Sequence, residues 1–290
     1  MTTNLQKPDH QALAKLLAQF LNDYTVVDVG AHGTGEDDVY TPALAADSSL
    51  VVGFEPNLVE CARLNDQAGG RRRYYPYAIG DGMPGTFHLC RAPLTSSLLR
   101  PNQSLLVRYE NLAELCEVIE EVPIETIRLD DINGVASVDF LKIDIQGATL
   151  PALQGAQRML EHTLVVHIEA EFVRIYQDEA LFSECEIFLR DRGFMFHHFH
   201  RIEGRRMTFG NRVVGQAPSQ ALWADAVFVP SFERLDTLNT SELVRLAWTM
   251  HTVYGACDMA MACLSRCGDE GDDAFSNRYQ ALLATHGMLA

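Results

Sequence analysis

The chain has 290 residues, of which 47% are hydrophobic and 21% charged, and its formal net charge at pH 7 is −16. This composition predicts a globular protein with room for one large domain and an appendage. The negative charge argues against a nucleic-acid partner, because phosphates are bound by clustered Lys and Arg. No apolar run approaches 18 residues, so we expect no membrane span.

The N-terminus lacks the basic segment and continuous apolar run of a secretory signal. Seven scattered cysteines without a C-x-x-C pair are typical of reduced thiols. Both observations predict a cytoplasmic protein. Cys263 and Cys267 are spaced to share a helix face, but a metal site there lacks a second ligand pair, so we interpret them as buried core residues.

Apolar residues at helical spacing predict a helix over 9–22. From there to Pro230 the pattern alternates between strands and helices. We expect strands at 24–30, 50–55, 72–79, 86–90, 118–129, 136–145, 164–171, 194–202 and 221–230, and helices at 57–67, 149–161 and 178–192. This alternation predicts an α/β fold with a mostly parallel, doubly wound sheet that ends in an antiparallel hairpin.

After Pro230 no strand pattern remains. Helical patterns over 240–253, 256–267 and 274–286 predict a helical C-terminal extension. We therefore divide the chain into an N-terminal helix (1–23), a main domain (24–230) and the extension (231–290). The sequence leaves open whether the extension covers the active site, packs on the rest of the fold or forms a homodimer contact.

A glycine-rich turn follows the first predicted strand. The phrase VDVGAHGTG carries Asp28 and then Gly30, Gly33 and Gly35, and the next strand ends in an acid, Glu55. Glycines let the backbone turn tightly and approach a ligand. An acid one βα unit after such a turn is typical of sites in which a carboxylate accepts hydrogen bonds from ribose hydroxyls.

The turn favours S-adenosylmethionine over NAD as the ligand. Its glycines read G-x-x-G-x-G, not the full dinucleotide pattern, and Glu36, Asp37 and Asp38 follow at once. Three acids disfavour a pyrophosphate, whereas a sulfonium cation tolerates them.

The phrase DFLKIDIQG ends another buried strand. Asp144 lies at its carboxyl end, where open α/β sheets bind ligands, and is our first catalytic candidate. Lys142, on the same face, is expected to pair with an acid or to extend towards solvent. On the next strand His167, Glu169 and Glu171 share a face, and ionisable groups in an apolar strand are costly to bury unless they are used.

Three histidines lie close together in a later strand. Strand alternation assigns His197 to one face and both His198 and His200 to the other. A joint metal site is therefore disfavoured.

Together these phrases resemble the FkbM family of S-adenosylmethionine-dependent methyltransferases over about residues 24–230. The matching phrases are VDVGA, VVGFEPN, YAIGDG, TSSLL, TIRLDDI, DFLKIDIQGA, LQGAQRML and LWADAVFV. The resemblance implies a class I methyltransferase (Rossmann-like) fold, S-adenosyl-L-methionine as cofactor and O-methylation of hydroxyl groups on sugars or secondary metabolites.

The resemblance also implies the cofactor-binding residues. These are the turn residues Asp28, Gly30, Ala31, His32 and Gly33, the ribose and adenosine residues Glu55, Pro56 and Asn57, the adenine residues Ala78 and Ile79, and Ser97 in a nearby loop. Two positions depart from the family pattern: His32 replaces the usual Asn, and Thr149 stands where the family usually has an acid.

Transfer to an alcohol requires a proton acceptor, for which Asp144, His167 and Glu169 are the candidates. A divalent ion held by Asp144 with Glu169 or Glu171 is an alternative that we disfavour, because the ligand set is incomplete. Carboxylates suit a sugar, glycan or related polar metabolite as acceptor. The altered turn and Thr149 also leave room for a binding partner or sensor protein without transferase activity.

Overall fold

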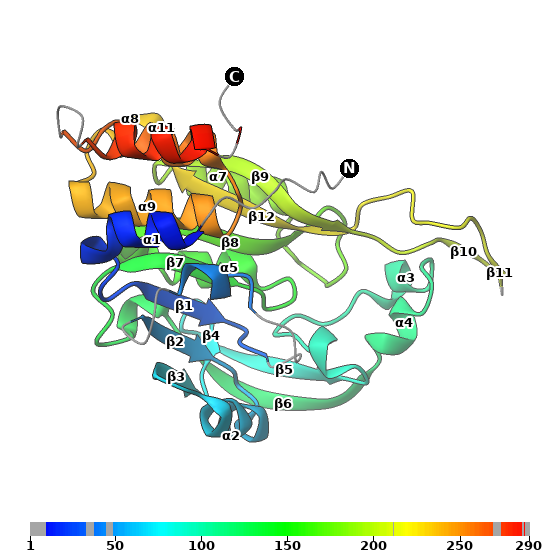
Figure 1. The fold of residues 1–290 in the computed structure, drawn as a ribbon. Helices are drawn as coiled ribbons and strands as arrows, with labels where there is room; N and C mark the ends of the chain where they lie inside the picture. Colours follow the sequence, from blue (N-terminus) through cyan, green and yellow to red (C-terminus); the bar gives the residue numbers. More distant parts are fainter. Residues whose placement is uncertain are drawn as a thin grey trace.

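The computed structural model describes residues 10–32, 38–44, 49–210, 212–268, 274–285 and 287. Its centre is a seven-stranded sheet in the order β3-β2-β1-β7-β8-β12-β9 (Figure 1). The strands are β1 (Thr25–Val29), β2 (Leu50–Phe54), β3 (Arg71–Tyr75), β7 (Val138–Ile143), β8 (Thr163–Glu171), β9 (Phe194–Glu203) and β12 (Trp223–Pro230). Neighbours from β3 to β8 are parallel, and β12 is antiparallel to both β8 and β9. The predicted doubly wound sheet and its final antiparallel hairpin are confirmed.

A second, smaller sheet lies beside the main one. The strand expected over 72–79 is divided into β3 and β4 (Ala78–Ile79), because Pro76 between them has no N–H to donate to a ladder. β4 pairs with β6 (Val118–Ile127), which also pairs with β5 (Pro84–Cys90). The short helices α3 (Gln103–Leu106) and α4 (Leu112–Leu115) lie near this sheet, and β10 (Thr208–Phe209) and β11 (Arg212–Val213) form a protruding hairpin (Figure 1).

Helices cover both faces of the main sheet (Figure 1). One face packs against α5 (Thr149–Gln154), α6 (Gln157–Glu161) and α7 (Phe182–Arg190), while α2 (Leu58–Gln67) packs on β3. The helix predicted over 149–161 is divided at Gly155, where a Cβ would lie 2.2 Å from the carbonyl oxygen of Gly80. α7 begins after the predicted start, because Asp178 has a φ of +56° and cannot join a right-handed helix.

The helices of the C-terminal region pack directly on the other face of the sheet. They are α8 (Phe232–Leu235), α9 (Thr240–Thr252), α10 (Cys257–Leu264) and α11 (Phe275–Thr285), and they share a hydrophobic core with α1 (His10–Leu17). Val26, Phe140 and Val227 of the sheet belong to the same core. In the described part of the chain, no helix is long and apolar enough to cross a membrane.

A buried ion pair ties α9 to the sheet. The Arg245 guanidinium donates from Nε to Asp139 Oδ1 at 2.7 Å, and the backbone N–H of Thr25 donates to Asp139 Oδ2 at 2.8 Å. Asp139 is only 1% exposed. Its charge therefore depends on these two donors.

We predict that Arg245→Met lowers the free energy of unfolding by about 3 kcal/mol, because it leaves a buried carboxylate unpaired. Urea denaturation measures the change. The control is Arg266→Met, whose guanidinium pairs with the exposed Asp236 at 2.7 Å and should cost less than about 1 kcal/mol. Equal small losses in both variants would contradict the role of the buried pair.

Candidate active site

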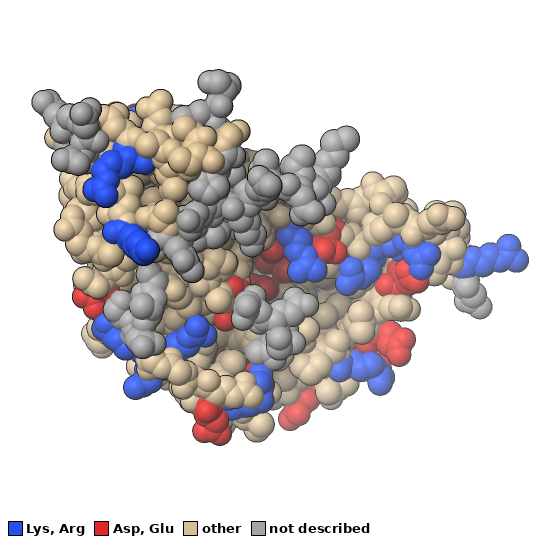
Figure 2. All heavy atoms as spheres, viewed as in Figure 1, with Lys and Arg blue, Asp and Glu red and all other residues tan. Residues whose placement is uncertain are grey.

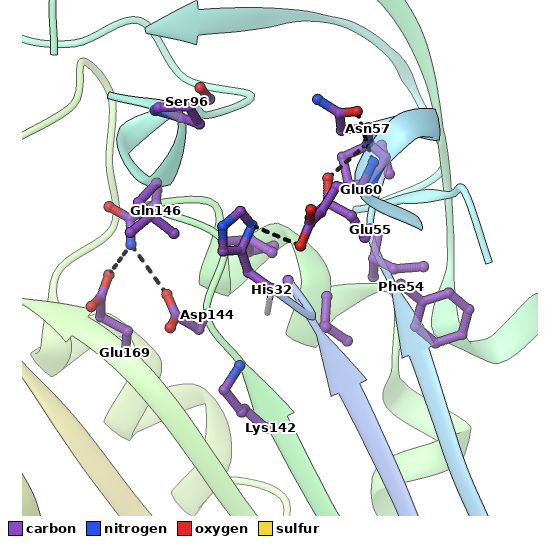
Figure 3. A pocket seen from close by; sticks show the side chains of 18 of the residues that line it. His32, Phe54, Glu55, Asn57, Glu60, Ser96, Lys142, Asp144, Gln146 and Glu169 are labelled. Carbon is purple, nitrogen blue, oxygen red and sulfur yellow. Dashed lines mark hydrogen bonds and ion pairs between the residues drawn. The ribbon is translucent and has the colours of Figure 1, made fainter. Parts of the chain in front are cut away.

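A cavity of about 430 Å³ opens at the carboxyl ends of β1, β2, β7 and β8, with residues of β4 and β5 on its opposite wall. This volume is typical of small-molecule sites. The side chains divide the cavity into two ends (Figure 3): Glu55, Asn57 and Glu60 lie at one, and Asp144 and Glu169 at the other. In the space-filling view, acidic side chains are seen inside the central hollow (Figure 2).

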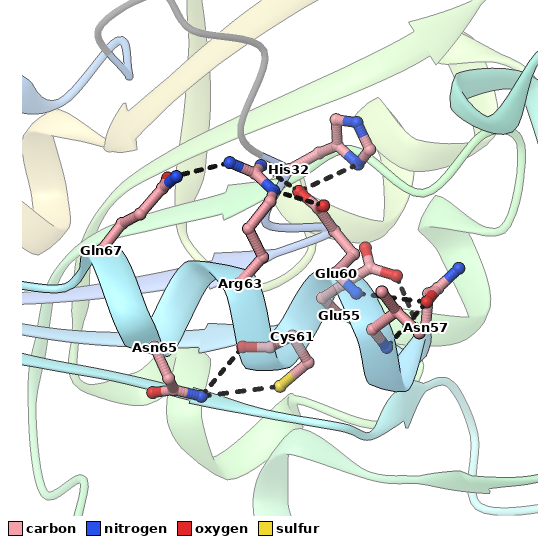
Figure 4. Close-up of polar contacts among 9 residues, drawn as sticks. His32, Glu55, Asn57, Glu60, Cys61, Arg63, Asn65 and Gln67 are labelled. Atoms are coloured by element: carbon pink, nitrogen blue, oxygen red, sulfur yellow. Dashed lines mark hydrogen bonds and ion pairs between the residues drawn. The ribbon is translucent and has the colours of Figure 1, made fainter.

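The first end is organised by the start of α2. The Asn57 side chain accepts hydrogen bonds from the backbone N–H groups of Val59 and Glu60, which confirms the predicted cap (Figure 4). The Asn57 backbone N–H in turn donates to Glu55 Oε1 at 2.7 Å. Burial raises the pKa of the Glu55 carboxyl to about 7, although this hydrogen bond opposes the shift. Glu55 is therefore an acceptor whose charge changes near neutral pH.

The wall beside Glu55 is flat and apolar. Phe54, Tyr77 and Ile79 line it. The rings of Phe54 and Tyr77 are stacked at 6.4 Å and 21°, and Tyr77 stacks in turn on Tyr75 at 5.8 Å and 13°. Such a wall can contact the face of a planar ring.

The turn after β1 brings two strand ends into contact. Gly30 has a φ of +81°, and a Cβ there would lie 1.9 Å from the backbone oxygen of Asp144. Only glycine fits this turn. His32 lines the cavity with Nδ1 3.9 Å from Glu60 Oε1, and Asp38 lines it as well. Gly33, with the rest of 33–37, lies outside the described residues.

At the second end one amide holds two carboxyl groups. Gln146 donates from Nε2 to Asp144 Oδ1 at 3.1 Å and to Glu169 Oε1 at 2.6 Å (Figure 3). Burial raises the pKa of Glu169 well above its ordinary value, and the neighbouring charge of Asp144 raises it further. Glu169 therefore keeps its proton at neutral pH and can act as a hydrogen-bond donor.

A buried ion pair supports this end from below. Lys142 donates from Nζ to Asp28 Oδ1 at 2.9 Å, which confirms the expected pairing with an acid, and the Tyr40 hydroxyl donates to Asp28 Oδ2 at 2.9 Å. Burial opposes the charge of Lys142, but Asp28 and Asp144 outweigh it and raise the pKa of the ammonium group. Lys142 thus stays charged beneath the carboxyl groups.

His167 and Asp225 form the side of the second end nearest β12. Both line the cavity, and His167 Nε2 lies 3.9 Å from Asp225 Oδ2. Burial lowers the pKa of His167 well below its ordinary value, so its imidazole is neutral. Burial, assisted by the charge of Asp144, raises the pKa of Asp225 to about 6.

The structure brings most of the expected site residues together. Those that line the cavity are Gly30, His32, Glu55, Pro56, Asn57, Ala78, Ile79, Asp144, His167 and Glu169. Asp28 and Ala31 are instead buried outside the lining, as are Glu171 and Ser97, whose neighbour Ser96 reaches the cavity. The Ser97 hydroxyl donates to the backbone oxygen of Gln146 at 2.6 Å.

Two expected departures have structural explanations. The Thr149 hydroxyl donates to the backbone oxygen of Glu169 at 3.0 Å and so fastens β8 to α5. His198 lies outside the cavity lining. Among the described residues, no group of three or more His, Cys, Asp or Glu side chains is placed to hold a metal ion.

Sequence reasoning missed Gln146, Asp225 and Arg201 as lining residues. Gln146 was present in the phrase DFLKIDIQG, and Asp225 is an acid within the apolar strand LWADAVFV. The same burial cost that singled out His167 and Glu169 could have found Asp225.

A sheet of this strand order, with an antiparallel last hairpin and a ligand-sized cavity at the carboxyl ends of its strands, defines a class I methyltransferase fold. The sequence model described as "Methyltransferase FkbM domain" matches residues 28–196. The chain therefore belongs to the FkbM methyltransferase family, and this family implies S-adenosylmethionine as the cofactor.

Three solved structures illustrate the fold similarity. The precorrin-6y C5,15-methyltransferase of Geobacter metallireducens is 12% identical, with 79% of this chain and 92% of that chain covered and a TM-score of 0.38. A SAM-dependent methyltransferase of Aquifex aeolicus is 13% identical, with 79% and 94% covered and a TM-score of 0.32. A 16S rRNA adenine methyltransferase variant of Catenulisporales acidiphilia is 14% identical, with 80% and 95% covered and a TM-score of 0.34. No curated protein sequence matched the chain significantly.

Proposed function

We propose that the protein transfers the methyl group of S-adenosylmethionine to a hydroxyl oxygen of a sugar, glycan or related polar metabolite. The observation that carries this proposal is the second end of the cavity, where Asp144, Glu169 and Asp225 converge. These groups differ in protonation, so together they can both accept hydrogen bonds from hydroxyls and donate to oxygens.

The first end fits the cofactor. The Glu55 carboxylate would accept hydrogen bonds from the ribose hydroxyls, and the wall formed by Phe54, Tyr77 and Ile79 would contact the adenine ring. The close approach at Gly30 leaves room for a ligand over the strand ends. Acidic groups such as Asp38 and Glu60 suit a cationic ligand and disfavour a pyrophosphate.

When bound, S-adenosylmethionine supplies an electrophilic methyl group on a sulfonium centre. Asp144 would accept the proton of the attacking hydroxyl. Glu169, which keeps its own proton, would donate a hydrogen bond to another oxygen of the acceptor and orient it. Gln146 holds both carboxyl groups in place through a single amide.

The charges of the second end favour a polar acceptor. Arg201 also lines this part of the cavity, and its Nε donates to Glu203 at 2.7 Å. A polyol can satisfy several of these groups at once, whereas an apolar ring would leave them desolvated and unpaired.

We predict that the affinity for S-adenosylmethionine decreases as the pH falls below about 7, by up to about tenfold per pH unit, because ribose hydroxyls need an ionised Glu55. Glu55→Ala should weaken binding at pH 8 by about 1.5–3 kcal/mol. Calorimetric titration from pH 5 to 8 measures both effects.

The control is Glu55→Gln, which cannot ionise. Its pH profile should be flatter than that of the wild type, and the difference isolates Glu55 from other groups that titrate at the cavity. A wild-type affinity that Glu55→Ala leaves unchanged would remove the basis for the ribose assignment.

We predict that Asp144→Asn lowers methyl transfer about a hundredfold, as for the loss of a positioned base, while cofactor affinity changes only a few fold. Glu169→Gln should retain activity within about tenfold, because the native group is already neutral. Single-turnover assays compare the two.

A larger loss in Glu169→Gln than in Asp144→Asn would reverse the two roles. Treating the wild type with EDTA provides a further check, because a metal-dependent reaction would stop and recover with added divalent ion. The proposed proton transfer to Asp144 predicts no effect of EDTA.

A further inference from the structure

Tyr254, in the turn between α9 and α10, contacts the active site from the C-terminal region. Its hydroxyl lies 3.0 Å from His167 Nδ1, and the two rings are nearly parallel at 11° with centroids 6.2 Å apart. The Tyr254 ring also stacks on Phe140 and meets the rings of His198 and His200 edge-on at 5.0 and 5.6 Å. One residue of the extension therefore lies against a side chain that lines the cavity.

β9 supplies two of these histidines because its alternation is interrupted. Register shifts relative to β12 occur between Asp225 and Ala226 and between Val227 and Phe228. As a result Phe196 and Phe199 pack together on one side, and the ring of His197 contacts that of His198 at 4.9 Å. The expectation that His197 lies on the face opposite His198 is therefore wrong, because bulges break the two-residue period.

The surroundings of His167 fix which nitrogen carries its proton. Lys142 on β7, and His198 and His200 on β9, disfavour a positive charge on the ring, so the imidazole is neutral with one N–H and one lone pair. Nε2 faces Asp225 at 3.9 Å, a distance of electrostatic contact and not of a formed hydrogen bond. A lone pair directed at a carboxylate would be repelled, so the proton belongs on Nε2.

This arrangement determines the role of the tyrosine. With the proton on Nε2, His167 Nδ1 can only accept, and the Tyr254 hydroxyl must donate to it. Among the described residues, no hydrogen-bond donor reaches the Asp225 carboxylate, and this group lines the cavity. Asp225 is thus available to a bound hydroxyl.

We propose that Tyr254 is a positioning residue of the active site: its hydroxyl donates to His167 Nδ1, so that His167 presents Nε2–H to Asp225 and fixes that carboxylate for the methyl acceptor. The C-terminal extension thereby completes the acceptor end of the cavity. This inference rests on the proposed function for its link to catalysis, but the hydrogen-bond chain itself can be measured without an acceptor.

The first test is ¹⁵N NMR of the imidazole nitrogens, with His167 assigned by comparison with His167→Gln. In the wild type, His167 should remain in the neutral Nε2–H form from pH 5 to 8. In Tyr254→Phe it should become protonated within this range, because the donor that stabilised its neutral form is lost. In Asp225→Asn the preference for Nε2–H should disappear. An unchanged His167 signal in both variants would overturn the proposal.

The second test is turnover with a hydroxyl acceptor. Tyr254→Phe should lower kcat/KM for the acceptor about tenfold, as for the loss of one neutral hydrogen bond, and leave the Kd for S-adenosylmethionine within about twofold. In an Asp225→Asn background the same change should cost less than about threefold, because both variants break one chain. Additive losses would contradict the chain.

The matched control is Tyr279→Phe. Tyr279 belongs to the same extension and its hydroxyl lies 2.8 Å from His251 Nδ1, away from the cavity lining. It should leave both the His167 signal and turnover unchanged, and an equal loss of turnover would mean general loosening of the extension. If the wild type methylates no hydroxyl, the proposed function fails, and the NMR result still decides the role of Tyr254.

Discussion

The ion pair between Lys142 and Asp28 is the interaction on which the site depends. Asp144, Glu169 and Asp225 converge at the ends of adjacent strands, where burial makes an excess of negative charge costly. The Lys142 ammonium, 2.9 Å from Asp28, provides the positive charge beneath them. The phrase that supplies Asp144 also supplies Lys142, two residues earlier on the same strand face, so strand β7 brings an acid and its counter-charge together.

This balance separates the protonation states of neighbouring groups. Glu169 is buried next to Asp144 and keeps its proton, while Asp225 is more exposed and its pKa rises only to about 6. His167 between β7 and β12 stays neutral because it is buried and faces Lys142 and two histidines. A cavity with acceptors and donors in fixed places can orient a polyhydroxylated ligand, and it does so with side chains held on adjacent strands.

Much of the fold could be predicted because its determinants are local. Apolar periodicity located the strands, and Asn57 marked the start of α2. The errors arose where one residue overrode the pattern: Pro76 divided a strand, Gly155 divided a helix, and Asp178 took a positive φ. At the site, motifs identified Glu55 and Asp144. They could not identify Tyr254, because its contact with His167 joins positions 87 residues apart and no local pattern marks it.

The most direct test of the account is transfer from S-adenosylmethionine carrying a ¹³C-labelled methyl group, with sugars and glycans as acceptors and NMR to identify the atom that receives the label. The account predicts a labelled methyl group on a hydroxyl oxygen of a polar acceptor. Label on nitrogen or carbon, or cofactor binding without transfer to any such acceptor, would contradict it.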